Sequence, residues 1–186
     1  MKAFSLIELL VVITIFAIMA TLTLPAISSI NKSGGITRGG QILGDQIVLA
    51  RQEAANKNRD VEVRIINMTN GLDVGYAGVQ LWIADEAGNM TASGRMNRMP
   101  EGVLVSSDSA LSPLITNISG TTNFAALGSR SYGGFRIRSS GKPDSSITTN
   151  NNFLTVQSAR DSNGLGDNFY AVRINPITGR LTIHRP

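Results

Sequence analysis

The acid with the most unusual surroundings in this chain is Glu8, which stands inside an apolar run from residue 4 to residue 24. The run contains no Lys, Arg, Asp, Asn, Gln, Gly or Pro. As a helix it would span about 30 Å, the thickness of the hydrocarbon core of a bilayer. A carboxylate within such a span costs roughly 2.5–3.5 kcal/mol on insertion scales, so it usually has a partner and a function. The sequence therefore predicts a membrane helix in which Glu8 has a specific role.

Two simpler explanations of this N-terminal run are weaker. A secretory signal peptide has a shorter apolar core followed by a small-x-small cleavage site, and residues 21–26 offer no clear one. A plain membrane anchor accounts for the length of the run but leaves the acid unexplained. Glu8 could still reach the headgroups by snorkelling, because five residues of helix lie only about 7 Å deep.

Catalytic residues are not evident anywhere in the sequence. His184 is the only histidine and cysteine is absent, so the chain has neither a disulfide framework nor a cysteine-based metal site. The glycines of 71–75 and 164–166 are too few for a dinucleotide fingerprint and indicate turns. Ser107, Asp108 and Ser109 are typical of a loop or cap. We expect a protein that is not an enzyme and that holds no metal or cofactor.

The chain carries a net charge of +4, which raises the question of nucleic-acid binding. Basic residues gather toward the C-terminal half, and the candidate contacts to nucleic acid are Arg136, Arg138, Arg180 and Arg185. Aromatic side chains that could stack on bases are few. We therefore favour a solvated basic face, and DNA binding by such a patch would weaken steeply with added salt.

Residues 3–13 read AFSLIELLVVI, and this stretch resembles the class III signal of type IV prepilins. The resemblance implies that a prepilin peptidase removes residues 1–3 by cutting between Ala3 and Phe4. It also implies N-methylation of the new amino terminus on Phe4 and retention of Glu8 as the acid of the mature chain. The family usually has glycine where this chain has Ala3, and alanine is small enough that we expect processing to proceed.

The same resemblance implies assembly into a filament. Glu8 of one subunit would pair with the Phe4 amine of its neighbour. Because the two charges lose hydration as they attract each other, the pair would set the register of the stacked helices more than it would stabilise them. Pro25 would match the proline that kinks the N-terminal helix where it leaves the membrane. The implied partners are other pilin or pseudopilin subunits, an inner-membrane assembly platform and membrane lipid. Lys2 favours a cytoplasmic N-terminus, which would place the C-terminal head in the periplasm or, after assembly, on a surface filament.

Two segments follow the run. In residues 25–59 we expect the helix to continue with a weakened or broken stretch at its glycines, which each cost about 1 kcal/mol in a helix interior, although a continuous helix is the alternative. The glycines are Gly34, Gly35, Gly39 and Gly40. Beyond them an apolar stripe at helical spacing is formed by Leu43, Ile47, Ala50 and Ala54.

Residues 60–186 have the pattern of a single β-rich head, large enough for one core. Alternation from Val61 to Ile66 predicts a strand, and Asn70-Gly71 predicts a turn. Further strands are expected at 76–84, 103–106, 135–138, 153–157, 170–174 and 181–184. We expect loop at 86–94, a mobile insert at 107–131 and a tight turn at 175–179. The fold class is therefore α+β, with a long N-terminal transmembrane or pilin helix packed on an antiparallel sheet.

Later segments carry two narrower resemblances. The joint from residue 50 to residue 61 is similar to that of the GspH/FimT-type minor pseudopilins. Most of the chain resembles the Verru_Chthon cassette protein D family, through the segments VLARQEAANKNRDVEVR, VSSDSAL, SYGGFRIRSSGKPD and NFYAVRINPITGRLTIHRP. These resemblances imply a type IV pilus or a type II secretion-like filament. FimT-type proteins bind DNA through a GRxR motif, of which this chain has Gly179-Arg180 but Thr182 in the second arginine position.

Overall fold

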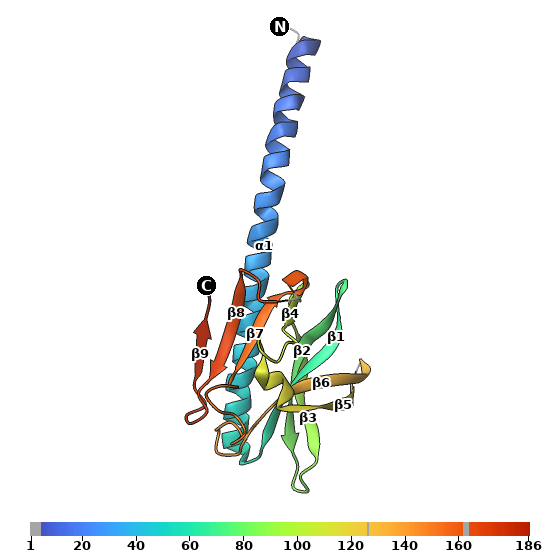
Figure 1. Cartoon of the computed structure of the whole chain (residues 1–186). Coiled ribbons are helices and arrows are strands. Elements are labelled where there is room, and N and C mark those ends of the chain that lie inside the picture. Colours follow the sequence, from blue (N-terminus) through green and yellow to red (C-terminus); the bar gives the residue numbers. More distant parts are fainter. Residues whose placement is uncertain (1–4, 126, 162–163) are drawn as a thin grey trace. The chain divides into compact units, whose positions relative to one another are not determined.

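The computed structural model describes residues 5–125, 127–161 and 164–186, with the side chains of 22–33 excepted (Figure 1). The chain divides into two compact units, residues 1–34 and residues 35–186. We call the second unit the head. Helix α1, Leu6–Lys57, contributes residues to both units.

Helix α1 is continuous through the glycine-rich stretch, so the expected break is wrong and the alternative holds. Two of these glycines, Gly39 and Gly40, allow close packing on the sheet, whereas a Cβ atom at Gly34 would meet nothing. A Cβ atom at Gly39 would stand 2.9 Å from Cγ1 of Val103, and one at Gly40 would collide with the ring of Tyr170. Tertiary burial of this face therefore outweighs the low helix propensity of glycine, as it commonly does in proteins.

The head contains one antiparallel sheet in the order β5-β6-β1-β2-β4-β7-β8-β9, with β3 also paired to β2. Its strands are β1 Val61–Asn70, β2 Asp73–Ala84, β3 Met90–Arg98, β4 Val103–Val105, β5 Ile118–Phe124, β6 Gly128–Ile137, β7 Phe153–Ser158, β8 Phe169–Ile174 and β9 Leu181–His184. Short 3-10 helices lie at η1 Pro113–Thr116 and η2 Ala159–Asp161. The α+β architecture is as the sequence predicts.

Two segments expected to be irregular form strands. Residues 86–94 were predicted as loop, but Met90 already pairs with Ala84 at the start of β3. The turn before it is closed by Asp85, whose carboxylate accepts a hydrogen bond of 2.8 Å from the Asn89 backbone N–H. Within the predicted insert 107–131 the chain forms η1, β5 and the first residues of β6. Backbone pairing along the sheet orders both segments, although their side chains are largely polar.

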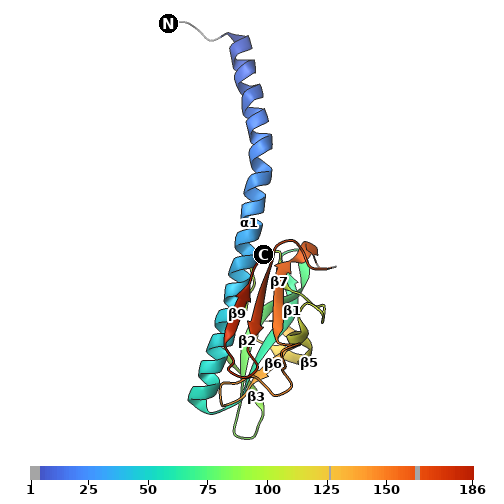
Figure 2. The same ribbon diagram turned by 60° about the vertical axis from the view of Figure 1, so that its left-hand side comes forward.

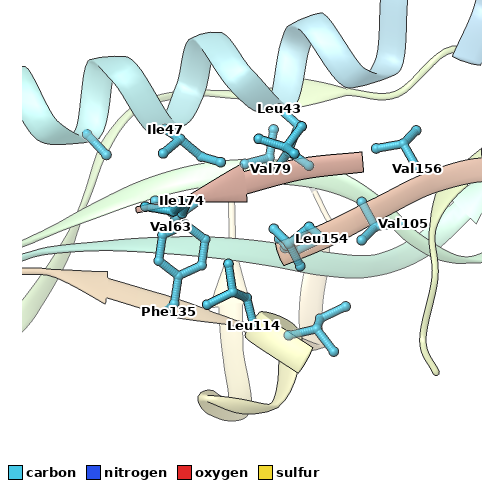
Figure 3. Close-up of a cluster of buried hydrophobic side chains, with 14 of the residues drawn as sticks. Leu43, Ile47, Val63, Val79, Val105, Leu114, Phe135, Leu154, Val156 and Ile174 are labelled. Atoms are coloured by element: carbon cyan, nitrogen blue, oxygen red, sulfur yellow. The ribbon is translucent and has the colours of Figure 1, made fainter. Parts of the chain in front are cut away.

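The hydrophobic core lies between the second half of α1 and one face of the sheet (Figure 2). Leu43 and Ile47 point from the helix toward the strands, as Figure 3 shows, and both are fully buried. They belong to one cluster with Val63 of β1 and Ile174 of β8, which come from distant parts of the sequence. The predicted helical stripe is therefore the face that packs on the sheet.

The other face of β1 carries a small polar and aromatic cluster. The guanidinium of Arg64 lies between two rings, 4.1 Å from the centroid of Trp82 and 4.2 Å from that of Tyr132. Phe124 from β5 contacts both rings edge-on. Because the Arg64 side chain is only 7% exposed and pairs with Glu62 at 2.7 Å, its charge is neutralised within the fold.

The C-terminal hairpin β8–β9 forms as predicted, around the turn at 175–179. Oδ1 of Asn175 accepts hydrogen bonds of 2.9 Å from the backbone N–H groups of Ile177 and Thr178. Gly179 closes the turn with a φ of +66°, a backbone conformation that glycine adopts without strain. The turn is held against α1, because Nη2 of Arg51 donates to the carbonyl oxygen of Thr178 at 3.1 Å.

Candidate functional site

The N-terminal end of α1 is closed by a reciprocal pair of hydrogen bonds between Ser5 and Glu8. The backbone N–H of Ser5 donates to Oε2 of Glu8 at 2.9 Å, and the backbone N–H of Glu8 donates to Oγ of Ser5 at 3.3 Å. This is a capping box, which satisfies two backbone donors that the first turn of a helix leaves unpaired. Glu8 therefore has a partner within its own chain, and its other carboxylate oxygen is not engaged in that pair.

The first turns of α1 are apolar on every side. Every residue from 6 to 19 is exposed, Glu8 included, and the large apolar ones are Leu6, Ile7, Leu9, Leu10, Val11, Val12, Ile13, Ile15, Phe16, Ile18 and Met19. The hydroxyl groups of Thr14 and Thr21 donate to backbone carbonyls of Val11 and Ile18 at 2.8 and 2.7 Å. A helix of this kind needs an apolar surrounding, because water would otherwise cover its whole circumference.

The search for membrane crossings gives a negative result over the described part of the chain. No helical stretch there reaches both the length and the hydropathy of a bilayer-spanning segment.

Three of the residues predicted to act in processing and assembly fall outside the described part of the structure. Ala3 and Phe4 precede the first described residue, and the side chain of Pro25 belongs to the undescribed range 22–33. The cleavage site, the methylated amino terminus and the proline kink therefore stay predictions from the sequence.

Two of the four candidate arginines are paired with acids of the head, and Arg136 shares its acid, Glu62, with Arg64. Nη2 of Arg136 lies 2.7 Å from Oε1 of Glu62, and this hydrogen bond raises the pKa of Arg136 further. Arg138 pairs with Asp144 at 2.9 Å and with Asp60 at 3.6 Å. A guanidinium already engaged by a carboxylate has less to offer a phosphate, so these two arginines contribute little to an anionic surface contact.

The other two candidate arginines, Arg180 and Arg185, are exposed on the C-terminal hairpin, at opposite ends of β9. Arg51 connects two turns of the head. Its Nε donates to the carbonyl oxygen of Gly141 at 3.2 Å, in the turn that follows Arg138. Its Nη2 donates to the carbonyl oxygen of Thr178, in the turn that precedes Arg180. The structure thus brings the backbones near Arg138 and Arg180 together, and a contact of these arginines with nucleic acid stays a prediction.

No group of three or more His, Cys, Asp or Glu side chains placed to hold a metal ion is found among the described residues. His184 is exposed at the end of β9. Asp108 accepts a hydrogen bond of 2.8 Å from the Ala110 backbone N–H, and Oγ of Ser106 accepts one from the Asp108 N–H at 3.3 Å. The 107–109 segment is thus a capped turn.

Sequence reasoning missed three residues that organise these regions: Ser5, Arg51 and Arg64. The spacing of Ser5 and Glu8 is the S-x-x-E signature of a capping box, so that signal was available. Arg51 gave none, because its partners are carbonyl groups of turns far away in the sequence. For Arg64, the spacing to Glu62 on the same strand was visible, but the rings of Trp82 and Tyr132 come from distant segments.

The comparisons with known proteins fit this description. Residues 1–24 match the family described as the prokaryotic N-terminal methylation motif. Most of the chain also resembles solved structures in its fold. Two solved structures of the minor pseudopilin EpsH, from the type II secretion system of Vibrio cholerae, are similar to it, with TM-scores of 0.50 and 0.52.

The likeness to EpsH is one of fold. The sequence identities are 14% and 13%, while the matches cover 81% and 83% of this chain and 97% and 96% of the EpsH chains. No curated protein matches the chain by sequence. The two kinds of match are independent, since one rests on the first 24 residues and the other on the arrangement of the helix and sheet.

Proposed function

We propose that this protein is a minor pilin or pseudopilin, a structural subunit of a type IV pilus or a type II secretion-like filament. The observation that carries the proposal is the joint presence of a methylation motif over residues 1–24 and a pseudopilin-like head. The protein would act by assembling with other subunits after processing at the membrane. A prepilin peptidase cuts between Ala3 and Phe4, Phe4 is N-methylated, and residues 4–24 hold the chain in the inner membrane with the head in the periplasm.

The Ser5–Glu8 capping box supports a specific order of events for Glu8. Before assembly, one carboxylate oxygen is occupied by the Ser5 N–H, which lowers the cost of holding the acid in an apolar surrounding. During assembly, the second oxygen is available to the Phe4 amine of a neighbouring subunit. Both residues of the box lie after the cleavage site, so the cap survives processing.

The first experiment is the N-terminal mass of the protein isolated from membranes of its host. The proposal predicts a chain that starts at N-methyl-Phe4. An intact Met1 would mean that the chain is an anchored domain that does not polymerise, and a start near residue 26 would mean an ordinary signal peptide. Either result overturns the proposal.

The second experiment separates the two uses of Glu8. Glu8→Gln keeps an oxygen that can accept from Ser5 but loses the charge, so it should keep the helical cap and lose filament incorporation. Glu8→Ala should lose both. Normal incorporation of Glu8→Gln, measured by crosslinking to other subunits, would show that charge pairing with the Phe4 amine is not needed.

Binding of DNA by the head is the less favoured alternative, because Arg136 and Arg138 are engaged by acids. Arg180→Ala in a DNA retention assay at low and high salt tests it. Membership of the Verru_Chthon cassette protein D family remains a prediction from the sequence segments that resemble it.

A further inference from the structure

We propose that one end of the head rests on the membrane surface, with Leu72 and Val74 inserted among the lipids. The inference rests on the proposed function, because it needs the anchor at residues 4–24. It concerns the end of the head formed by residues 70–74 and 99–103, which we call the anchor-side end.

The first observation is the exposure of two aliphatic side chains at the β1–β2 turn. Leu72 is 99% exposed and Val74 is 71% exposed. Leu72 is one of the two residues that connect the strands, since Asn70 pairs directly with Asp73. Turn positions of this kind usually carry Gly, Asn, Asp or Ser, so a leucine there calls for an apolar partner.

The second observation is that this turn is held rigidly. Nδ2 of Asn70 donates to the Pro100 carbonyl at 2.8 Å, and the Asn70 side chain is buried. The side chain of Glu101 lies against Gly71, whose φ is +68°. Leu72 is therefore presented on a fixed support, and a fixed apolar tip loses little conformational freedom when it inserts.

The third observation is where this end lies in the head. A Cβ atom at Gly35, the first residue of the head, would be 3.4 Å from Val103 and 3.9 Å from Pro100. The anchor-side end thus surrounds the start of the helix within the head. Only residues 25–34 separate Gly35 from the apolar run, a length of about 15 Å as helix. Chain connectivity therefore keeps this end of the head close to the bilayer.

The opposite end supplies a matched control. Ile177 is 73% exposed, similar to Val74, but its turn is bonded to Arg51. Arg51 lies 16 residues beyond Gly35 in α1, about 24 Å along the helix. Figure 1 likewise shows the β1–β2 turn and the β8–β9 turn at opposite ends of the head. An exposed aliphatic residue at each end allows the effect of position to be compared at similar exposure.

The test uses the full chain in phosphatidylcholine vesicles, and the absence of native cysteine allows single labelled sites. The variants are Ile13→Cys, Leu72→Cys, Val74→Cys and Ile177→Cys, each carrying an environment-sensitive fluorophore. Quenching by lipids with a doxyl group reports contact with the acyl region. We expect strong quenching at 13, clear quenching with a blue shift at 72 and 74, and neither at 177.

The pattern of results separates the two proposals. If the label at position 13 is quenched but the labels at positions 72 and 74 are no more quenched than the label at position 177, the membrane contact of the head is overturned and the anchor stays intact. No quenching at 13 would overturn the anchor and this inference with it. A blue shift at 72 without quenching by doxyl lipids would mean contact with another protein subunit, and equal quenching at 72 and 177 would mean unspecific adsorption.

A second pair of variants shows whether the label itself drives insertion. Val74→Asp in the chain labelled at 72 should reduce the quenching, because it removes an apolar neighbour at the same tip. Ile177→Asp in the same labelled chain should leave it unchanged. Equal effects of the two substitutions would contradict the proposal.

Discussion

Gly40 provides a sharp test of the close contact between α1 and the sheet. A Cβ atom added at this position would overlap the ring of Tyr170, which is only 6% exposed and has little room to move. Gly40→Ala should therefore destabilise the head, even though alanine is the better helix former. A helix held mainly by its own propensity would respond in the opposite direction.

The expected size follows from two opposing contributions. Overpacking of a well-packed core costs typically 1–3 kcal/mol, and replacing glycine by alanine in a helix interior gains about 1 kcal/mol. Because the overlap involves ring atoms and not the end of a flexible chain, we expect a net loss of about 1–2 kcal/mol. For a head of this size, such a loss lowers Tm by about 3–6 °C.

Gly44→Ala is the matched control, since its added Cβ would meet only Cδ1 of Leu181, at 4.0 Å. It should gain about 0.5–1 kcal/mol from helix propensity alone. The assay is urea unfolding of the full chain in mild detergent, followed by the fluorescence of Trp82, the only tryptophan. Equal stability of the two variants, or a gain for Gly40→Ala, would refute the reasoning.

Three further perturbations test the head. Arg64→Lys keeps a positive charge opposite Glu62 but loses the stacking of the guanidinium on the rings. The free energy of unfolding, measured by circular dichroism, should therefore fall by about 1–2 kcal/mol. An unchanged unfolding midpoint would mean that the stacking contributes nothing to stability. Partial burial raises the pKa of Asp144, but hydrogen bonds from neighbouring serine groups and the charge of Arg138 lower it more. Its contribution to stability is therefore present above about pH 4 and lost at lower pH, and Asp144→Asn should flatten that loss; identical acid profiles would contradict this. Arg51→Ala should cost about 1–2 kcal/mol and speed amide exchange in the C-terminal turn, whereas unchanged exchange would show that the turn holds itself.

The parts of the fold that follow from local patterns could be predicted from the sequence. Leu43 and Ile47 repeat at helical spacing, and Val61 and Val63 alternate as in a strand, although the structure buries both faces of β1 from residue 61 to residue 66. The turn at 175–179 is specified by residues within it, since Asn175 caps its own turn. In each case the deciding interaction lies within a few residues.

The errors in the fold arose where the deciding partner is distant. Gly40 looks like a helix breaker until Tyr170, from the other end of the chain, is placed against it. Strand β3 reads MTASGRMNR and has no alternation, so only its backbone pairing with β2 reveals it. Strand β5 was hidden in the same way, because its small and polar residues are typical of loops.

The candidate site was predictable to a different degree at each residue. Glu8 stands out because it is a single acid in an apolar run, and its role in capping follows from Ser5 three residues before it. The arginines were harder to judge. Their net charge is visible in the sequence, but Arg136 is paired with Glu62, 74 residues earlier, so the formal charge overstates what the surface offers.

The contact between Arg51 and Thr178 has a consequence for biosynthesis. These residues are 127 positions apart in the chain, and the same helix also packs on β1 and β8. The apolar side of α1 therefore emerges from the ribosome long before its last covering strand exists. Folds dominated by such long-range pairs form slowly. The side of the helix that receives the C-terminal turn therefore stays uncovered until the last strand of the sheet has been synthesised.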